Sequence, residues 1–219
     1  MPLTLPYLGL LGLALVILVV LLEIGLIEAV YHKLGMSHRA VILLLFATLV
    51  GSFINVPVAA VATGRMVHDR TIVSHGFAYV IPHVMVAGHM LIAINVGGAL
   101  IPILVCVYLL VRVGGLFAAI VATAGVTALV YHFSRIVPGL GISVPTLMPG
   151  IAAAILATLL GRQKSAAVAY IAGTLGCLLG ADILNLPAYH QFHAPVASIG
   201  GAGTFDAVFI SGIIAVLLA

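Results

Sequence analysis

Two aspartates near the carboxyl end of the chain are the residues best suited to chemistry. Asp182 and Asp206 lie in GADILNLPAYHQFHAPVASIGGAGTFD, residues 180–206, within sequence that is otherwise largely apolar. A charged aspartate at the centre of a membrane helix costs about 2.5–3.5 kcal/mol, so its presence is a reason to look for a function. Two carboxylates that meet can share a proton, because like-charge repulsion raises one pKa. Such a pair could act as acid and base, or exchange a proton for a cation.

The position of the two aspartates on consecutive helices favours their contact. Asp182 lies about four residues before the end of an expected helix at 166–186, and Asp206 lies about seven residues into the next, at 199–219. These depths are roughly 6 and 10 Å below the same face. Glycines around both residues permit close packing of the helices. The alternative is that the carboxylates pair with arginines on that side, namely Arg65, Arg70 or Arg135.

A histidine pair between the aspartates is a candidate for metal binding. His190 and His193 are spaced H-x-x-H, and with Asp182 or Asp206 they could bind Zn²⁺ or another divalent ion. The alternative is that both are exposed loop residues, and no other cofactor is expected. Glu28 can reach lipid headgroups or Lys33 at the end of the first expected helix.

Other polar residues and glycines interrupt apolar segments. Amide side chains could bind a substrate, although helix capping also explains them. Glycine pairs break helices and leave backbone groups free for ions or substrates. A deep glutamate could line a polar cavity or form a structural hydrogen bond. The candidate substrate- or ion-binding residues are therefore Glu23, Asn55, Asn95, Gly97, Gly98, Asn185, Gly200 and Gly201.

The composition predicts a membrane protein. The 219 residues are 64% hydrophobic and 6% charged, and their mean hydropathy is +1.37, so a soluble domain is excluded. The net charge of +3 is scattered, and nucleic acid is not an expected partner. The expected partners are the lipid bilayer and an ion or small solute. The two cysteines fit buried small side chains.

The apolar segments predict an all-α, polytopic integral membrane protein with about seven transmembrane helices, because a spanning helix satisfies its own backbone. Residues 1–219 form a single transmembrane domain. The third helix is expected to break at Gly97–Gly98, and a polar stretch at 63–82 precedes it. The seven expected helices cover residues 5–30, 40–60, 83–111, 116–133, 151–160, 166–186 and 199–219.

The loop charges predict an amino terminus outside. With that orientation the inner loops hold five basic residues and the outer loops hold three, as the positive-inside rule favours. The inner set is Lys33, Arg39, Arg112, Arg162 and Lys164, and the outer set is Arg65, Arg70 and Arg135.

A short pattern occurs twice in the chain. INVP (54–57) is followed by NVGGA (95–99), and LNLP (184–187) is followed by SIGGA (198–202). This order predicts a parallel internal repeat of helical hairpins, with copies at about 40–113 and 164–219. Helix stops, caps and common glycine contacts explain the same strings without a duplication.

The strings SIGGAGTFDAVFISGIIAVLLA, NVGGALIP, INVP and GADILNL resemble an uncharacterised family of bacterial and archaeal polytopic membrane proteins, known as a domain-of-unknown-function family. The resemblance runs from the second expected helix to the end of the chain. It implies a helical fold in a prokaryotic cytoplasmic membrane, and it implies no activity.

A looser resemblance is to the GxGD intramembrane aspartyl proteases. GAGTFD is similar to their Gly-x-Gly-Asp loop, and GAD could supply the second aspartate. Thr204 and Phe205, however, separate Gly203 from Asp206, and no Pro-Ala-Leu string follows. This resemblance implies peptide hydrolysis by Asp182 and Asp206.

These observations leave three functions open. The first is a transporter or ion-binding protein whose aspartate pair takes up a proton or cation. The second is a hydrolase in which the pair activates water. The third is a non-catalytic structural subunit in which the polar residues fix helix packing.

Overall fold

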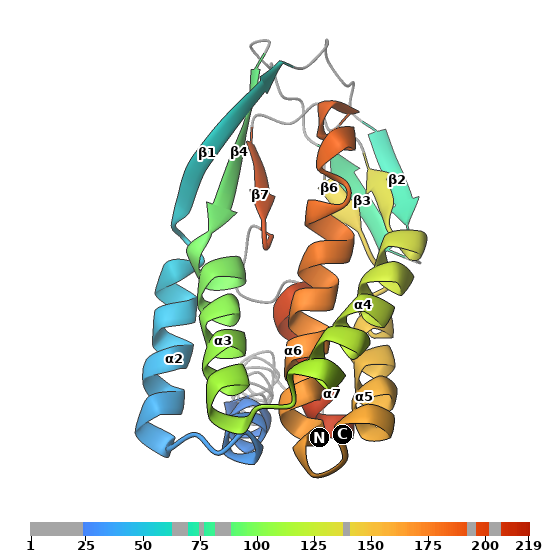
Figure 1. Ribbon diagram of the computed structural model, residues 1–219. Helices are drawn as coiled ribbons and strands as arrows, with labels where there is room; N and C mark the ends of the chain where they lie inside the picture. Colours follow the sequence, from blue (N-terminus) through green and yellow to red (C-terminus); the bar gives the residue numbers. More distant parts are fainter. Residues whose placement is uncertain are drawn as a thin grey trace, which may run out of the picture.

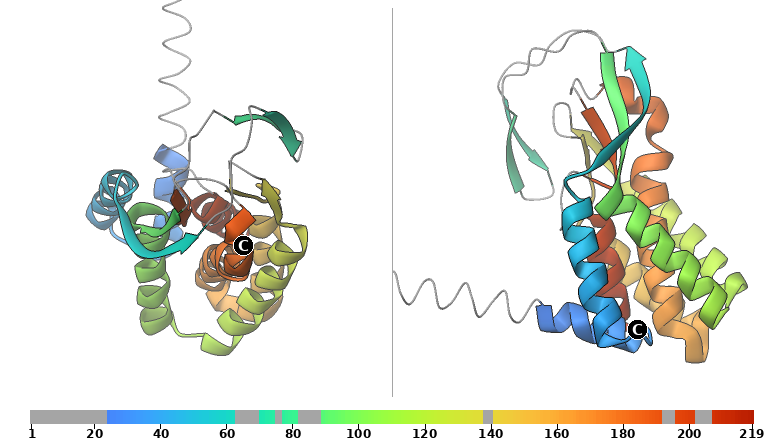
Figure 2. Two further views of the ribbon diagram at one scale, coloured as in Figure 1. Left: turned by 90° about the horizontal axis from the view of Figure 1, so that it is seen from above. Right: turned by 90° about the vertical axis from the view of Figure 1, so that its left-hand side faces the viewer.

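The protein is mostly helical, with its helices gathered at one end and its strands at the other (Figure 1). A computed structural model describes residues 24–62, 70–74, 77–81, 89–137, 141–191, 196–201 and 207–219. Most of the first expected helix, 5–30, lies outside this part of the chain. Residues 24–33 are helical, and this helix lies across the end of the bundle (Figure 2).

A central helix organises the bundle. This helix, α6 (Ser165–Cys177), contacts four others, and nearly all of its residues are buried. The four neighbours are α3 (Ile101–Val113), α4 (Leu116–Phe133), α5 (Met148–Gly161) and α7 (Ala207–Leu218), and α2 (His38–Gly51) packs against α3.

Glycines allow α6 to approach its neighbours closely. A Cβ atom on Gly176 would lie 2.6 Å from side-chain carbons of Val126 on α4, which is closer than real contacts allow. On Gly180, in the π-helical turn that continues α6, it would lie 2.6 Å from the backbone oxygen of Thr127. Small residues at such contacts are typical of helix pairs in membranes, where dispersion replaces the hydrophobic effect.

Three apolar helical runs in the described part of the chain are long enough to cross a membrane: Val96–Val113, Leu116–Phe133 and Met148–Ile183. The last run turns back at Arg162, whose φ is 49°, so it contributes both α5 and α6. Large apolar side chains remain exposed on the bundle, including Val111 at 83% and Phe117 at 80%. This surface suits lipid and is compatible with an integral membrane protein.

A three-stranded sheet extends the bundle beyond α2 and α3 (Figure 1). Its strands are β1 (Asn55–Ala62), β4 (His89–Asn95) and β7 (Val196–Ile199), in the order β1-β4-β7. The β1–β4 pair is antiparallel and the β4–β7 pair is parallel. Two antiparallel pairs accompany it: β2 (Arg70–Ser74) with β3 (Phe77–Ile81), and β5 (Arg135–Val137) with β6 (Gly141–Ser143).

The strands correct the all-α expectation. The helices expected at 40–60 and 83–111 are wrong where β1 and β4 lie. Pro57 lacks the N–H that a helix interior needs and holds Val56 in an extended conformation. The β1–β4 register shifts between Pro57 and Ala59, where the proline cannot donate to the ladder.

The expected helices agree better with the structure after residue 113. The prediction at 116–133 coincides with α4, and the one at 151–160 lies within α5. The helix expected at 166–186 is α6, continued by a π-helical turn, η3 (Leu178–Ile183). The helix expected at 199–219 begins later, as α7, because Gly200 and Gly201 adopt φ values of 82° and 75°.

Candidate functional site

Several of the residues selected from the sequence meet where the helices give way to the sheet. At this point α2 ends, a second π-helical turn, η1 (Val96–Leu100), leads into α3, and β7 ends beside η3. We call this region the junction. Its residues are Ser52, Asn55, Asn95, Gly97, Gly98, Asp182, Ser198 and Gly200.

Asn95 is the centre of the junction and has no exposed surface. Its Oδ1 atom accepts a hydrogen bond from the backbone N–H of Gly98 at 2.7 Å, which caps η1. Its Nδ2 atom donates to the backbone oxygen of Ser52 at 2.8 Å and to Oδ1 of Asn55 at 3.2 Å. One buried amide therefore starts the α3 helical run and ties it to the end of α2 and the start of β1.

Asn55 extends the network to the last strand. Its Oδ1 atom also accepts a hydrogen bond from the hydroxyl of Ser198 on β7, at 2.6 Å. Asn55 is exposed and Ser198 is half-buried, so this oxygen lies at the accessible edge of the junction.

The backbones of the two Gly-Gly-Ala motifs touch. A Cβ atom on Gly98 would lie 1.9 Å from the backbone oxygen of Gly200, and one on Gly97 would lie 2.2 Å from that of Thr48. No side chain fits at either point. The glycines thus bring the start of η1 against the end of α2 and against the turn that follows β7.

Asp182 enters the junction from η3. Its Oδ2 atom accepts a hydrogen bond from the backbone N–H of Gly200 at 2.9 Å, and its side chain is half-buried. Tyr189, in the 3₁₀ segment η4 (Leu186–Gln191), is 1% exposed. Burial raises the pKa of the Tyr189 hydroxyl, and the negative charge of Asp182 raises it further. The hydroxyl therefore remains neutral beside the carboxylate.

Asn185 has a capping role. Its Nδ2 atom donates to the backbone oxygens of Gly180 and Ala181 at 3.0 and 2.8 Å, and to the hydroxyl of Ser134 at 3.1 Å. These bonds satisfy backbone carbonyl groups at the irregular end of the helix. The Nδ2 group of Asn185 is therefore already hydrogen-bonded.

The remaining predicted site residues are not joined to the junction by the structure. Asp206, Glu23 and His193 lie outside the described residues, so the contact between Asp182 and Asp206 stays a prediction. The backbone of His190 belongs to η4, but the position of its side chain is outside the description. Gly201 closes the turn after β7 by donating to the backbone oxygen of Ser198 at 3.2 Å.

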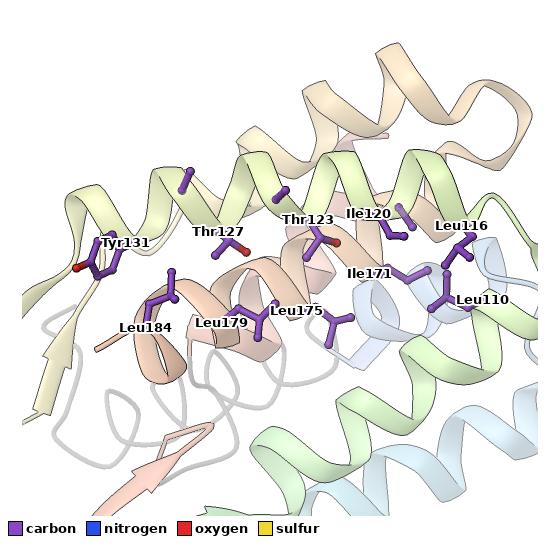
Figure 3. A pocket seen from close by; sticks show the side chains of 13 residues that line it. Leu110, Leu116, Ile120, Thr123, Thr127, Tyr131, Ile171, Leu175, Leu179 and Leu184 are labelled. Atoms are coloured by element: carbon purple, nitrogen blue, oxygen red, sulfur yellow. The ribbon is translucent and has the colours of Figure 1, made fainter. Parts of the chain in front are cut away.

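An apolar groove lies along α3, α4 and α6 and has a volume of about 630 Å³ (Figure 3). Its lining is aliphatic except for Tyr131 and two threonines, Thr123 and Thr127. Both threonine hydroxyls are buried and have no hydrogen-bond partner among the described residues. The sequence analysis did not select these threonines, although their spacing of four within an apolar helix places them on one face.

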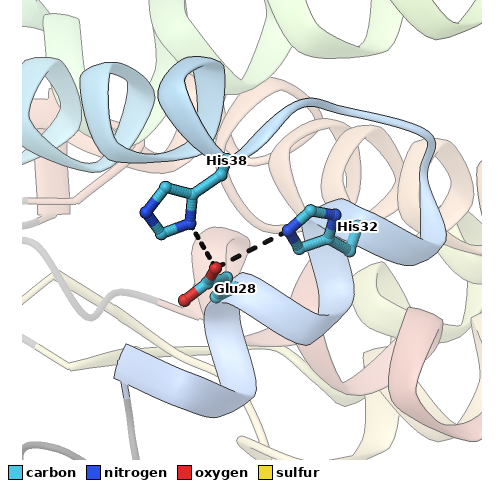
Figure 4. Close-up of side chains that lie close together, drawn as sticks. All are labelled: Glu28, His32 and His38. Atoms are coloured by element: carbon cyan, nitrogen blue, oxygen red, sulfur yellow. Dashed lines mark hydrogen bonds and ion pairs between the residues drawn. The ribbon is translucent and has the colours of Figure 1, made fainter.

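A second cluster of ligating side chains was missed by the sequence analysis. Glu28 forms a hydrogen bond with Nδ1 of His38, and Nε2 of His32 lies 3.6 Å from the same carboxylate oxygen (Figure 4). Lys33, which the sequence suggested as a partner of Glu28 besides lipid headgroups, instead donates to the backbone oxygen of Val216 at 3.0 Å, so this pairing is not the one adopted. The Glu-x-x-x-His spacing could have indicated the cluster.

Comparison with known proteins gives a family and no activity. A family model described as a protein of unknown function (DUF1614) matches residues 49–218. The chain belongs to this family. The resemblance to an uncharacterised family is thereby confirmed, whereas no likeness of the DUF1614 chain to the GxGD proteases is shown. No curated protein and no solved structure matches the chain significantly. The matched range contains the junction, and it begins after the Glu28 cluster.

Proposed function

We propose that this DUF1614 protein is a membrane transporter or ion-binding protein in which Asp182, together with Asp206, takes up a proton or cation at the junction. The observation that carries the proposal is the half-buried Asp182 carboxylate bound to Gly200 between irregular helix ends. An acidic residue beside apolar helices is costly unless it is paired or functional.

The chemical groups of the junction suit a proton or a hard cation. Carboxylate, amide and backbone oxygens are ligands that such cations prefer. Asp182 supplies a carboxylate, and Asn55 supplies an amide oxygen that also accepts hydrogen bonds from Asn95 and Ser198.

The irregular helices support the same function. Single π-helical turns often occur at functional sites, and interrupted helices hold ions in many transporters. Here η1 and η3 reach the junction from the two halves of the chain. Gly98 of η1 packs against Gly200, whose N–H is bound by Asp182 of η3, so the packing of one half of the chain depends on the other.

The full architecture is part of the proposal. We infer seven spans, with copies at about 40–113 and 164–219 forming a parallel repeat. The parallel pairing of β4 with β7 and the contact between the two Gly-Gly-Ala motifs support the repeat. Basic residues at the end where α2 begins support an amino terminus outside a prokaryotic cytoplasmic membrane. They include Lys33, Arg39, Arg112, Arg162 and Lys164.

Transport in proteoliposomes tests the proposal. Purified protein is reconstituted, and proton, Na⁺ and K⁺ fluxes are followed with trapped fluorescent indicators under an imposed membrane potential. We expect flux above that of empty vesicles, its loss in Asp182→Asn and Asp206→Asn, and partial retention in Asp182→Glu. Thr158→Val, which removes a hydroxyl bonded within α5, is the control and should retain the flux.

The outcomes separate this function from the alternatives. Equal flux in wild type and Asp182→Asn, or no flux of any tested cation, would contradict it. Cleavage of reporter transmembrane peptides that depends on both aspartates would favour the hydrolase. A lower melting temperature in Asp182→Asn without any change in ion response would favour a structural role.

A further inference from the structure

We propose that Glu28, His32 and His38 bind one divalent transition-metal ion of the Zn²⁺ class. This site is separate from the junction, because it lies at the opposite end of α2. The proposal does not depend on transport. One carboxylate and two imidazoles are a ligand set that such ions commonly use.

The three side chains are already gathered. One potential ligand atom from each lies within 4.8 Å of the other two. His32 follows Glu28 by one helical turn, and His38 comes from the first residue of α2, so two elements contribute (Figure 4). A metal about 2.0–2.2 Å from each ligand requires a modest adjustment of the side chains alone.

The turn between the two helices fixes the position of His38. Gly35 has a φ of 76°, and its N–H donates to the backbone oxygen of His32 at 2.8 Å. The N–H of Met36 donates to the oxygen of Tyr31 at 3.0 Å, which completes the end of the helix. Arg112 on α3 donates to the oxygen of Gly35 at 2.7 Å. The ligands are therefore held by a turn that is itself attached to the bundle.

The arrangement of polar atoms suits one shared metal ion. A single oxygen of Glu28 faces both imidazoles. The same oxygen can accept a hydrogen bond from each imidazole, and a metal ion placed between the three groups would bind all of them. Three protein ligands would also leave a coordination position for water.

The exposure of the three side chains and the packing of the 24–33 helix fit a metal ion that links two helices. The side chains of Glu28, His32 and His38 are 33%, 50% and 59% exposed, so an ion can enter from solvent. The opposite face of the 24–33 helix is buried, with Ile27, Val30 and Tyr31 in the main core cluster. A bound ion would join this helix to the start of α2.

Zinc binding to the full-length protein in detergent tests the site. After treatment with a chelator, Zn²⁺ is titrated against a competing fluorescent indicator, and the bound metal is examined by X-ray absorption. We expect one ion per chain with two imidazoles and oxygen in its coordination shell. Affinity should fall more than about tenfold in Glu28→Gln and in His38→Gln.

Two controls keep the result specific. His132→Gln removes an exposed histidine outside the cluster and should bind as wild type does. His190→Gln/His193→Gln removes the other predicted metal site, and it too should retain binding. If the Glu28 variant does not fold, the more exposed His38→Gln carries the test. Binding that persists in both Glu28→Gln and His38→Gln, or a wild type that binds no zinc, would overturn the proposal.

Discussion

At the scale of single residues, glycine determines where the two halves of the chain can meet. Gly98 and Gly200 place backbone against backbone, and the space that a methyl group would need is already filled. Gly25 differs, because a Cβ atom added there meets nothing within 4 Å. Alanine substitutions at Gly98 and at Gly25 can therefore be compared as changes at a crowded and at an open position.

We expect Gly98→Ala to destabilise the protein strongly and Gly25→Ala to leave it unchanged or slightly more stable. The first forces a methyl group against the rigid backbone oxygen of Gly200, which costs at least about 1–3 kcal/mol. The second gains up to about 1 kcal/mol of helix propensity. Unfolding in mixed detergent micelles measures both. Equal stability of the two variants would argue against close contact at Gly98.

Sequence patterns identified many of these residues without revealing their partners. The INVP, NVGGA and SIGGA strings singled out Asn55, Asn95 and the glycine pairs, which do meet. The atoms they contact depend on the folding of distant segments. Asn185 looked equivalent to Asn55 in its motif, yet it caps a local helix end. The shared motif alone does not show whether its asparagine joins distant segments or caps a local helix end.

At the scale of elements, Asn95 controls the change from strand to helix. It ends β4, caps η1 and holds the end of α2. The sequence indicated an interruption near Gly97–Gly98, but it was interpreted as a break within one helix. Short apolar runs rich in isoleucine and valine fit a buried helix or a strand equally well, and pairing with β1 and β7 decides between them.

We expect Asn95→Ala to lower the free energy of unfolding by about 2–3 kcal/mol, because the N–H of Gly98 and the backbone oxygen of Ser52 lose their partner in a buried place. Ser37→Ala is the control. Ser37 caps α2 through an exposed hydrogen bond of 3.4 Å, so its loss should cost less than about 1 kcal/mol. Thermal unfolding in detergent, followed by circular dichroism, compares the variants. A smaller cost at Asn95 than at Ser37 would contradict the capping role.

At the scale of the whole molecule, the bundle and the sheet occupy opposite ends (Figure 1). Composition was sufficient to predict apolar helices, since every spanning backbone must satisfy itself. The small sheet was not predicted. Its strands are as apolar as the helices, and one of its two pairings, β4 with β7, connects segments more than a hundred residues apart.

Cysteine labelling in oriented vesicles tests the arrangement of the two ends. The two native cysteines are buried. A membrane-impermeant maleimide should modify Gln163→Cys, in the basic 3₁₀ segment η2 (Arg162–Lys164), from the cytoplasmic side alone. It should modify Ala59→Cys, exposed on β1, from the opposite side alone. Labelling of both positions from one side would contradict a transmembrane bundle with this orientation.

The length of α2 bears on how much of the membrane potential acts at Asp182. Its 14 residues span about 21 Å, whereas the hydrocarbon layer is about 30 Å thick. If α2 begins at the inner edge of that layer, the Asp182 carboxylate sits roughly two-thirds of the way across. A charge arriving there from outside would cross about one-third of the voltage drop, worth about 0.8 kcal/mol per 100 mV. In the proposed function, occupancy of the Asp182 carboxylate by a cation should therefore respond to the membrane potential.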